Sequence, residues 1–184
     1  MILSALILIP LVGALLIGIW PTAIASNMAR RGALVTLAIN LVVTLTLVLQ
    51  FDISNSAFQF VERLDWIDNL GLSYSLGVDG ISFPLLVIHS LLCFVATYIS
   101  NDVKRARLYY PMLLLIASAV AGAFLAQNLL LFFLFYELEL IPMYLLIAIW
   151  GGARRGYAAT KFLIYTAFSG ALIFAAFLGL ALLS

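Results

Sequence analysis

Residues 129–150 read LLLFFLFYELELIPMYLLIAIW, an apolar run with two carboxylic acids near its middle. A helix needs about 20 such residues to cross the hydrocarbon core of a bilayer, so this run is long enough. The apolar sequence already begins at Leu108, and one helix from there to Trp150 would far exceed a core of about 30 Å at about 1.5 Å per residue. Gln127-Asn128 is the only polar break in this block. The sequence therefore predicts two helices with a turn at that pair.

Six apolar segments of the chain pass the same length test. Of the residues, 66% are hydrophobic and 9% are charged, and the mean hydropathy is +1.21, whereas a soluble domain is about half apolar and a quarter charged. None of the segments has the alternation of a membrane barrel strand. The sequence therefore predicts an all-α membrane protein embedded in the lipid bilayer. Its six transmembrane helices are expected at Leu3–Trp20, Leu34–Phe51, Ile81–Ser100, Leu108–Ala126, Leu129–Trp150 and Ala158–Leu183.

The first of these segments has a second interpretation. Ala23-Ile24-Ala25 resembles the small-residue cleavage site of a secretory signal. A signal carries its basic residues before the apolar stretch, whereas here none precedes it and Arg30 and Arg31 follow it. We therefore expect a retained transmembrane helix.

The basic residues test the helix count independently, because cytoplasmic loops of membrane proteins collect Lys and Arg. With six helices, only Arg63 falls on the side opposite to the others. We therefore expect loops 21–33, 101–107 and 151–157 to be cytoplasmic and both termini to lie on the other side. The 9 Lys and Arg nearly balance the 8 Asp and Glu, so no basic excess points to a nucleic acid partner. The residues on the expected cytoplasmic side are Arg30, Arg31, Lys104, Arg105, Arg107, Arg154, Arg155 and, at the start of the sixth helix, Lys161.

The long connection 52–80 is acidic and is expected on the non-cytoplasmic side. Apolar and polar residues alternate in its segments 58–60 and 72–76, which predicts a small β-hairpin at the membrane edge. Trp66 is a candidate anchor at the lipid headgroups. Asp79, just before the third helix, is typical of an N-cap, with proton entry as the alternative role.

Glu137 and Glu139 are the first candidate site residues. A charge at this depth costs about 2.5–3.5 kcal/mol on insertion scales, and such acids usually face a bundle interior and mark proton or ion routes. Residues two apart on a helix point about 200° away from each other, so these two cannot form a facing pair. Pro142 removes the N–H partner of the Leu138 carbonyl, so we expect a kink beside the acids. The alternative is a glutamate that only forms hydrogen bonds across helices.

His89 and Lys161 are the other candidates. His89 lies midway along the third helix, and its near-neutral pKa would suit a proton relay, although a lone histidine more often bonds a neighbouring helix. Lys161 enters the first turn of the sixth helix and could simply extend to the interface. The lone Cys93 can form neither an internal disulfide nor a metal cluster. The sequence shows no metal-ligand spacing and no phosphate-binding glycine loop, so we expect no cofactor in this chain.

A long stretch of the chain resembles one family. The residues that carry the resemblance are 126–142, AQNLLLFFLFYELELIP, then Ile149-Trp150-Gly151-Gly152, Tyr157–Phe162 and, before the third helix, Gly77–Ser82. Together they are similar to chain 4 of the type I NAD(P)H dehydrogenases, the antiporter-like subunit of complex I and its cyanobacterial and chloroplast relatives. The likeness covers nearly the whole chain.

The resemblance implies a proton-pumping module of about fourteen helices with two inverted five-helix repeats. Residues 1–107 would then hold three N-terminal helices and the acidic loop 52–80, and residues 108–184 the first three helices of the first repeat. In the family the acid that matches Glu137 pairs with a lysine on the seventh helix, which would follow Ser184. Other membrane-arm subunits are implied as partners, and quinone and iron–sulfur clusters would belong to them.

Two features indicate which members of the family the chain resembles most. The ELELIP form at 137–142 is similar to photosynthetic versions and favours a cyanobacterial thylakoid membrane, with luminal termini. The N-terminus MILSALILIP looks like the variants of carbon dioxide uptake complexes, which implies a carbonic-anhydrase-like partner with a zinc site. A subunit of a multi-subunit sodium/proton antiporter is the main alternative, and a purely structural scaffold is the third.

Overall fold

The computed structural model describes residues 1–19, 26–55, 57–67 and 72–183. Within them lie six helices that are all long and apolar enough to cross a membrane, so the predicted helix count is confirmed for the described part of the chain. The turn at Gln127-Asn128 is also confirmed, since it separates the fourth and fifth helices. The elements are α1 (Ile2–Ile19), α2 (Ser26–Val48), β1 (Gln59–Ile67), β2 (Leu72–Val78), α3 (Ser82–Ile99), α4 (Ala106–Leu125), α5 (Leu129–Trp150) and α6 (Arg155–Leu183).

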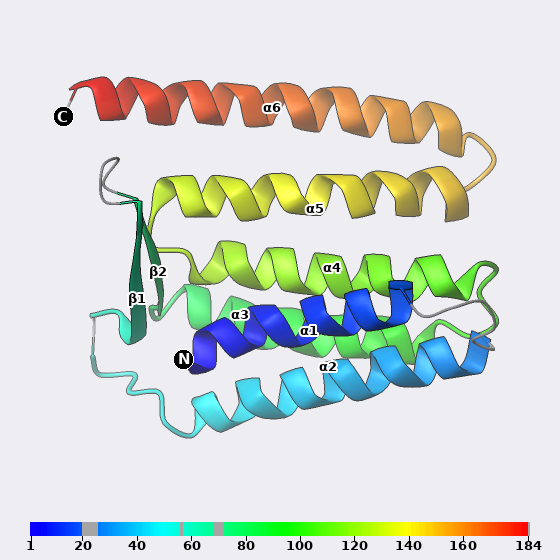
Figure 1. Ribbon diagram of the computed structural model, residues 1–184, viewed down its shortest axis with the longest axis horizontal. Coiled ribbons are helices and arrows are strands. Elements are labelled where there is room, and N and C mark those ends of the chain that lie inside the picture. The colour runs from blue at the N-terminus through cyan, green and yellow to red at the C-terminus, as the bar shows by residue number, and fades with distance from the viewer. Residues whose placement is uncertain (20–25, 56, 68–71, 184) are drawn as a thin grey trace.

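The helices lie side by side and alternate in direction along the chain (Figure 1). Helices α1 to α4 form a compact group, and α5 and α6 follow outward from α4 in succession. Half of α4 is buried but very little of α6 is. Helix α4 is therefore the centre of the bundle, while α6 contacts the rest of the described chain through α5.

Small residues let α4 approach both of its main neighbours, α1 and α5. Ser118 donates a buried hydrogen bond of 2.8 Å to the carbonyl of Ile7 in α1. On the side of α5, a Cβ built on Gly122 would lie 2.6 Å from a ring carbon of Phe135, closer than real side chains pack. Small residues on α4 therefore allow close approach of both neighbouring helices.

The predicted hairpin is present, and the polar break at 127–128 holds it in place. Strands β1 and β2 pair antiparallel, with Arg63 opposite Ser75. The backbone N–H of Gln127 donates to the Ser75 carbonyl at 3.0 Å, and the Ser75 hydroxyl donates to Oε1 of Gln127 at 2.7 Å. The hairpin turn 68–71 and the side chain of Trp66 lie outside the described part, so the anchor role of Trp66 stays a prediction.

Glu62, on β1, closes the N-terminal end of α1. Its carboxylate accepts hydrogen bonds from the backbone N–H groups of Leu3 (2.9 Å) and Ser4 (3.1 Å) and from the Ser4 hydroxyl (2.5 Å). It also pairs with the amino group of Met1 at 2.7 Å, and its side chain is 11% exposed. Burial raises the pKa of Glu62, but the bonds from the N-terminal amino group, Ser4 and Leu3 outweigh burial, and the pKa lies below its usual value. The hairpin thus supplies the acceptors that the first turn of α1 lacks.

We expect Glu62→Gln to destabilise the chain by about 1.5–3 kcal/mol, the range for hydrogen bonds to a charged group. Because the folded-state pKa is lowered, this stability is present above the unfolded-state pKa and is lost as the pH falls through the folded-state value. Unfolding of the reconstituted chain in a denaturing detergent, followed by circular dichroism from neutral to acidic pH, checks this. Equal stability of the two proteins at neutral pH would contradict it.

Asp79 caps α3, as the sequence predicts. Its Oδ1 accepts from the N–H groups of Ile81 (3.0 Å) and Ser82 (2.7 Å), and the Ser82 hydroxyl accepts from the N–H of Asp79 at 3.1 Å. The bond from the Ser82 backbone is the main reason why the pKa of Asp79 lies below its usual value. This reciprocal pattern is a capping box, so the structure supports the N-cap role of Asp79.

The basic residues gather at one end of the bundle. The N-terminal ends of α2, α4 and α6 lie together, at the end opposite the hairpin (Figure 1). Arg30 donates from this end of α2 to the Tyr98 carbonyl of α3 at 2.5 Å, and Arg107 donates to the Gly18 carbonyl of α1 at 3.2 Å. The predicted separation from Arg63 on β1 is confirmed. Which side of the membrane this end faces stays a prediction.

Candidate functional site

Glu137 projects from α5 toward α6. Its Oε1 atom is buried and has no hydrogen-bond partner in the described part of the chain. The carboxyl group lies against Gly170 of α6: a Cβ built on that glycine would overlap Oε1 and lie 2.9 Å from the carboxyl carbon. An acid within a membrane helix, with a buried oxygen that no described residue bonds, is held at a cost. This makes Glu137 the strongest candidate for a proton carrier in the chain.

Asn128 fixes the start of the helix that carries Glu137. Its side-chain oxygen accepts from the N–H groups of Leu130 at 2.8 Å and Leu131 at 3.3 Å, and its amide donates to the Ser73 carbonyl of β2 at 3.4 Å. The sequence analysis predicts a turn at Asn128 but not this cap. An Asn directly before an apolar run is a signal from which the cap can be predicted.

Glu139 is half-buried on α5 and makes no hydrogen bond within the described residues. The helix is continuous from Leu129 to Trp150, so Glu139 points about 200° away from Glu137. The two acids therefore do not form one site. Pro142 is buried and does not end the helix, and the kink expected beside it stays a prediction.

His89 faces α4, and its ring bonds the backbone there. Its Nε2 lies 3.1 Å from the Ala117 carbonyl, and its ring meets the edge of Phe124 at 6.0 Å between centroids. A carbonyl only accepts, so Nε2 carries the hydrogen and Nδ1 is left as an acceptor in the neutral ring. The structure thus shows the helix-bonding role that the sequence offered as the alternative to a relay.

We expect His89→Leu to destabilise the chain by about 0.6–1.5 kcal/mol, through loss of one interhelical hydrogen bond. His89→Gln, which keeps an N–H donor, should recover part of that loss in the same detergent unfolding assay. If His89→Gln kept its stability but lost proton translocation, the relay role would be supported instead.

Lys161 lies on an exposed face of α6, away from Glu137. Its ammonium group is 5.8 Å from the ring centroids of both Tyr157 and Tyr165, one turn before and one turn after it. Nine residues, or about 13 Å along the helix, separate it from Gly170, which the Glu137 carboxyl contacts. The described chain therefore does not bring Lys161 to Glu137. No group of three His, Cys, Asp or Glu side chains in the described residues could hold a metal ion.

Comparison with known proteins shows the family that the chain resembles. Residues 126–184, which hold α5 and α6, match the family described as NADH:quinone oxidoreductase/Mrp antiporter, TM. Over 181 residues the chain is 43% identical to NAD(P)H-quinone oxidoreductase chain 4 2 of Microcystis aeruginosa, covering 98% of this chain and 33% of the relative. The chain belongs to this antiporter-like family. It is also 41% identical over 180 residues to chain 4-2 of Synechocystis sp., covering 97% of this chain and 32% of the relative.

Solved structures of the antiporter-like family share the fold. The chain's structure matches a chain of respiratory complex I from Thermus thermophilus with a TM-score of 0.82 and 24% identity, over 100% of this chain and 36% of that one. It matches the Mrp complex from Dietzia sp. with a TM-score of 0.77 and 20% identity, over 96% of this chain and 19% of that one. The chain spans about a third of the length of the curated relatives it matches.

Proposed function

We propose that this chain is the front part of a proton-translocating membrane subunit of a type I NAD(P)H- or ferredoxin-quinone oxidoreductase. The observation that supports this most directly is the buried carboxyl oxygen of Glu137 between α5 and α6, which has no hydrogen-bond partner among the described residues. It stands in a chain whose curated relatives are named NAD(P)H-quinone oxidoreductase chain 4. The subunit would couple quinone reduction, carried out elsewhere in the complex, to proton movement.

In this proposal, Glu137 alternates between the neutral and the charged form. Burial favours the neutral acid, whereas a cation nearby favours the carboxylate. A cation that moves toward and away from Glu137 would therefore make it release and rebind a proton. If the family resemblance holds, that cation would be a lysine on a helix after Ser184. Glu139, Lys161 and His89 remain secondary candidates for the proton route.

The setting of the subunit is also proposed. Its partners would be the other membrane-arm subunits, which would hold the quinone and iron–sulfur clusters, and its membrane the cyanobacterial thylakoid with luminal termini. The carbon dioxide uptake variant would add a carbonic-anhydrase-like subunit with zinc. Finding that subunit in the purified native complex would support the uptake variant, and its absence would favour the respiratory variant.

Proton uptake by membrane vesicles that hold the complex tests the proposal. We expect the interior of the vesicles to become acidic only when the electron donor and quinone are both present. A quinone-site inhibitor should abolish this acidification, and sodium should not affect it. A sodium gradient that drives proton movement without quinone would support the antiporter alternative, whose Mrp fold this chain also shares. If the complex pumped protons equally well after deletion of this subunit, the proposal would be contradicted and a purely structural scaffold role would remain.

A further inference from the structure

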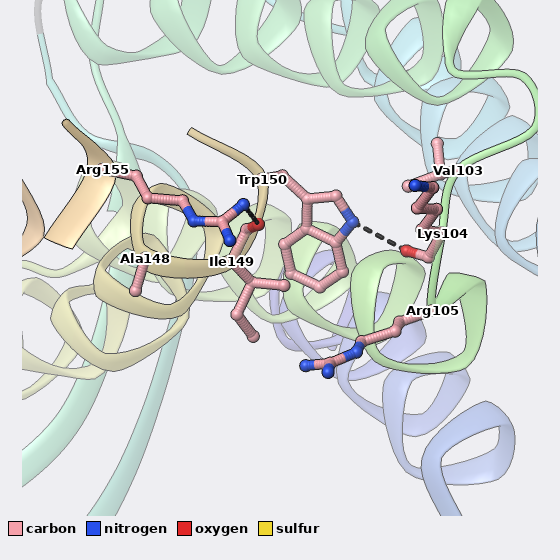
Figure 2. Close-up of a pocket in the computed structure, with 7 residues that line it drawn as sticks. All are labelled: Val103, Lys104, Arg105, Ala148, Ile149, Trp150 and Arg155. Carbon is pink, nitrogen blue, oxygen red and sulfur yellow. Dashed lines mark hydrogen bonds between the residues drawn. The ribbon is translucent and has the colours of Figure 1, made fainter. Parts of the chain in front are cut away.

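A hollow of about 530 Å³ opens at the basic end of the bundle, where α5 ends and α4 and α6 begin. Figure 2 shows the side chains around it. The segment before α4 and the last turn of α5 form most of its wall, and the first residue of α6 completes it. The lining residues are Val103, Lys104, Arg105, Ala148, Ile149, Trp150 and Arg155.

Specific hydrogen bonds hold the walls of this hollow in place. The Trp150 indole donates to the Lys104 carbonyl at 2.7 Å, which joins the end of α5 to the segment before α4 (Figure 2). Arg155 donates to the Ile149 carbonyl at 3.0 Å. The Trp150 ring also packs against Tyr109 of α4, with centroids 5.1 Å apart and planes at 68°. The hollow is therefore a defined feature of the packing between three elements.

The hollow is positively charged. Lys104, Arg105 and Arg155 line it, and no acidic residue does. The first turns of α4 and α6 contain no acid, and no side chain caps the start of α4 at Arg105. The positive ends of the α4 and α6 dipoles add to the three cations, and the negative end of the α5 dipole, at Trp150, offsets part of that charge. The geometry and charge suit a compact anion.

The hollow continues into apolar surface on α5. At about 100° per residue, Ile141 lies about 20° and Leu138 about 80° around the helix from Ala148, so the three residues form one broad face. Their side chains are 63% and 42% exposed in the described chain. A free phosphate would gain nothing from this strip, whereas an acyl chain attached to the anion would cover it. Charge and apolar surface together favour a lipid.

We propose that this hollow binds the phosphodiester headgroup of an anionic phospholipid, with one acyl chain along the Leu138–Ile141–Ala148 face of α5. Arg155 and Lys104 contact the phosphate oxygens, and Trp150 and Val103 form the apolar wall. The headgroup lies at the end of α5, and Ala148 is eleven residues, or about 16 Å along the helix, from Glu137. The acyl chain passes beside Glu137, and the proposal does not depend on the proposed function. It would fix lipid at the junction of α4, α5 and α6.

The test uses the intact complex with its full-length subunit, exchanged into detergent and titrated with phosphatidylglycerol, and bound lipid is quantified by mass spectrometry. Lys104→Gln/Arg105→Gln removes two charges but leaves the backbone carbonyl that Trp150 bonds. Arg31→Gln/Arg154→Gln is the matched control, because it removes two charges at the same end, outside the hollow. We expect the complex with the first variant to bind phosphatidylglycerol about thirtyfold more weakly at one class of site. The control variant should bind it as the wild type does.

Inorganic phosphate in excess is the second probe, and it should not displace the bound phosphatidylglycerol. Equal lipid binding by both variants and the wild type would overturn the proposal. Displacement by phosphate alone would show an anion site without a lipid. If Lys104 in the lipid-free complex resists a water-soluble amine reagent, a later part of the chain covers the hollow, and the proposal also fails.

Discussion

Replacing Glu137 with Gln in the full-length subunit is expected to lower proton translocation through it by about 10²-fold or more, the usual size of a lost proton-transfer group. Glutamine keeps the shape of the side chain but cannot carry a proton, so the packing against Gly170 should survive. Proton pumping per electron pair, measured in vesicles with the assembled complex, checks this. Assembly of the complex should be unchanged.

Glu139→Gln is the matched control for this prediction, because it removes the same charge two residues away on another face of α5. We expect it to reduce pumping much less than Glu137→Gln. Equal losses would mean that both acids lie on the route. Full pumping by Glu137→Gln would contradict the assignment of the proton carrier.

Gly170→Leu is expected to lower proton pumping about as much as Glu137→Gln does, but for a different reason. Even a Cβ at this position would overlap the Glu137 carboxyl group, so a leucine must either displace the acid or push α6 from α5. Overpacking of this kind costs about 1–3 kcal/mol. The vesicle assay measures the loss of pumping, and detergent unfolding measures the loss of stability.

Gly179→Leu separates this effect from the general cost of a larger residue in α6. Nothing lies within 4 Å of a Cβ built on Gly179, so that variant should keep both pumping and stability. If Gly170→Leu also kept both, the contact between Glu137 and α6 would be wrong.

The number and order of the helices follow from the sequence alone, but α2 begins at Ser26 and not at the expected Leu34, because the helix continues through the polar and basic residues that the sequence analysis assigned to loop 21–33. A bilayer sets the length of every crossing segment, and each apolar run had to meet that length independently of its neighbours. The break at Gln127-Asn128, the cap at Asp79 and the clustering of basic residues at one end depend on local sequence or on simple alternation. Each of these features depends only on the order of residues along the chain, so one sequence is enough to predict it.

The tertiary structure decided which groups meet. Glu62 and the first turn of α1 are 58 and 59 positions apart, and no local pattern links them. Likewise, only the packing of α5 against α6 shows that Gly170 faces Glu137, and only that of α3 on α4 gives His89 its partner at Ala117. In a membrane almost every helix is apolar all round, so hydrophobicity does not say which faces touch. Small residues and polar contacts make that choice, and they act only once the helices are side by side.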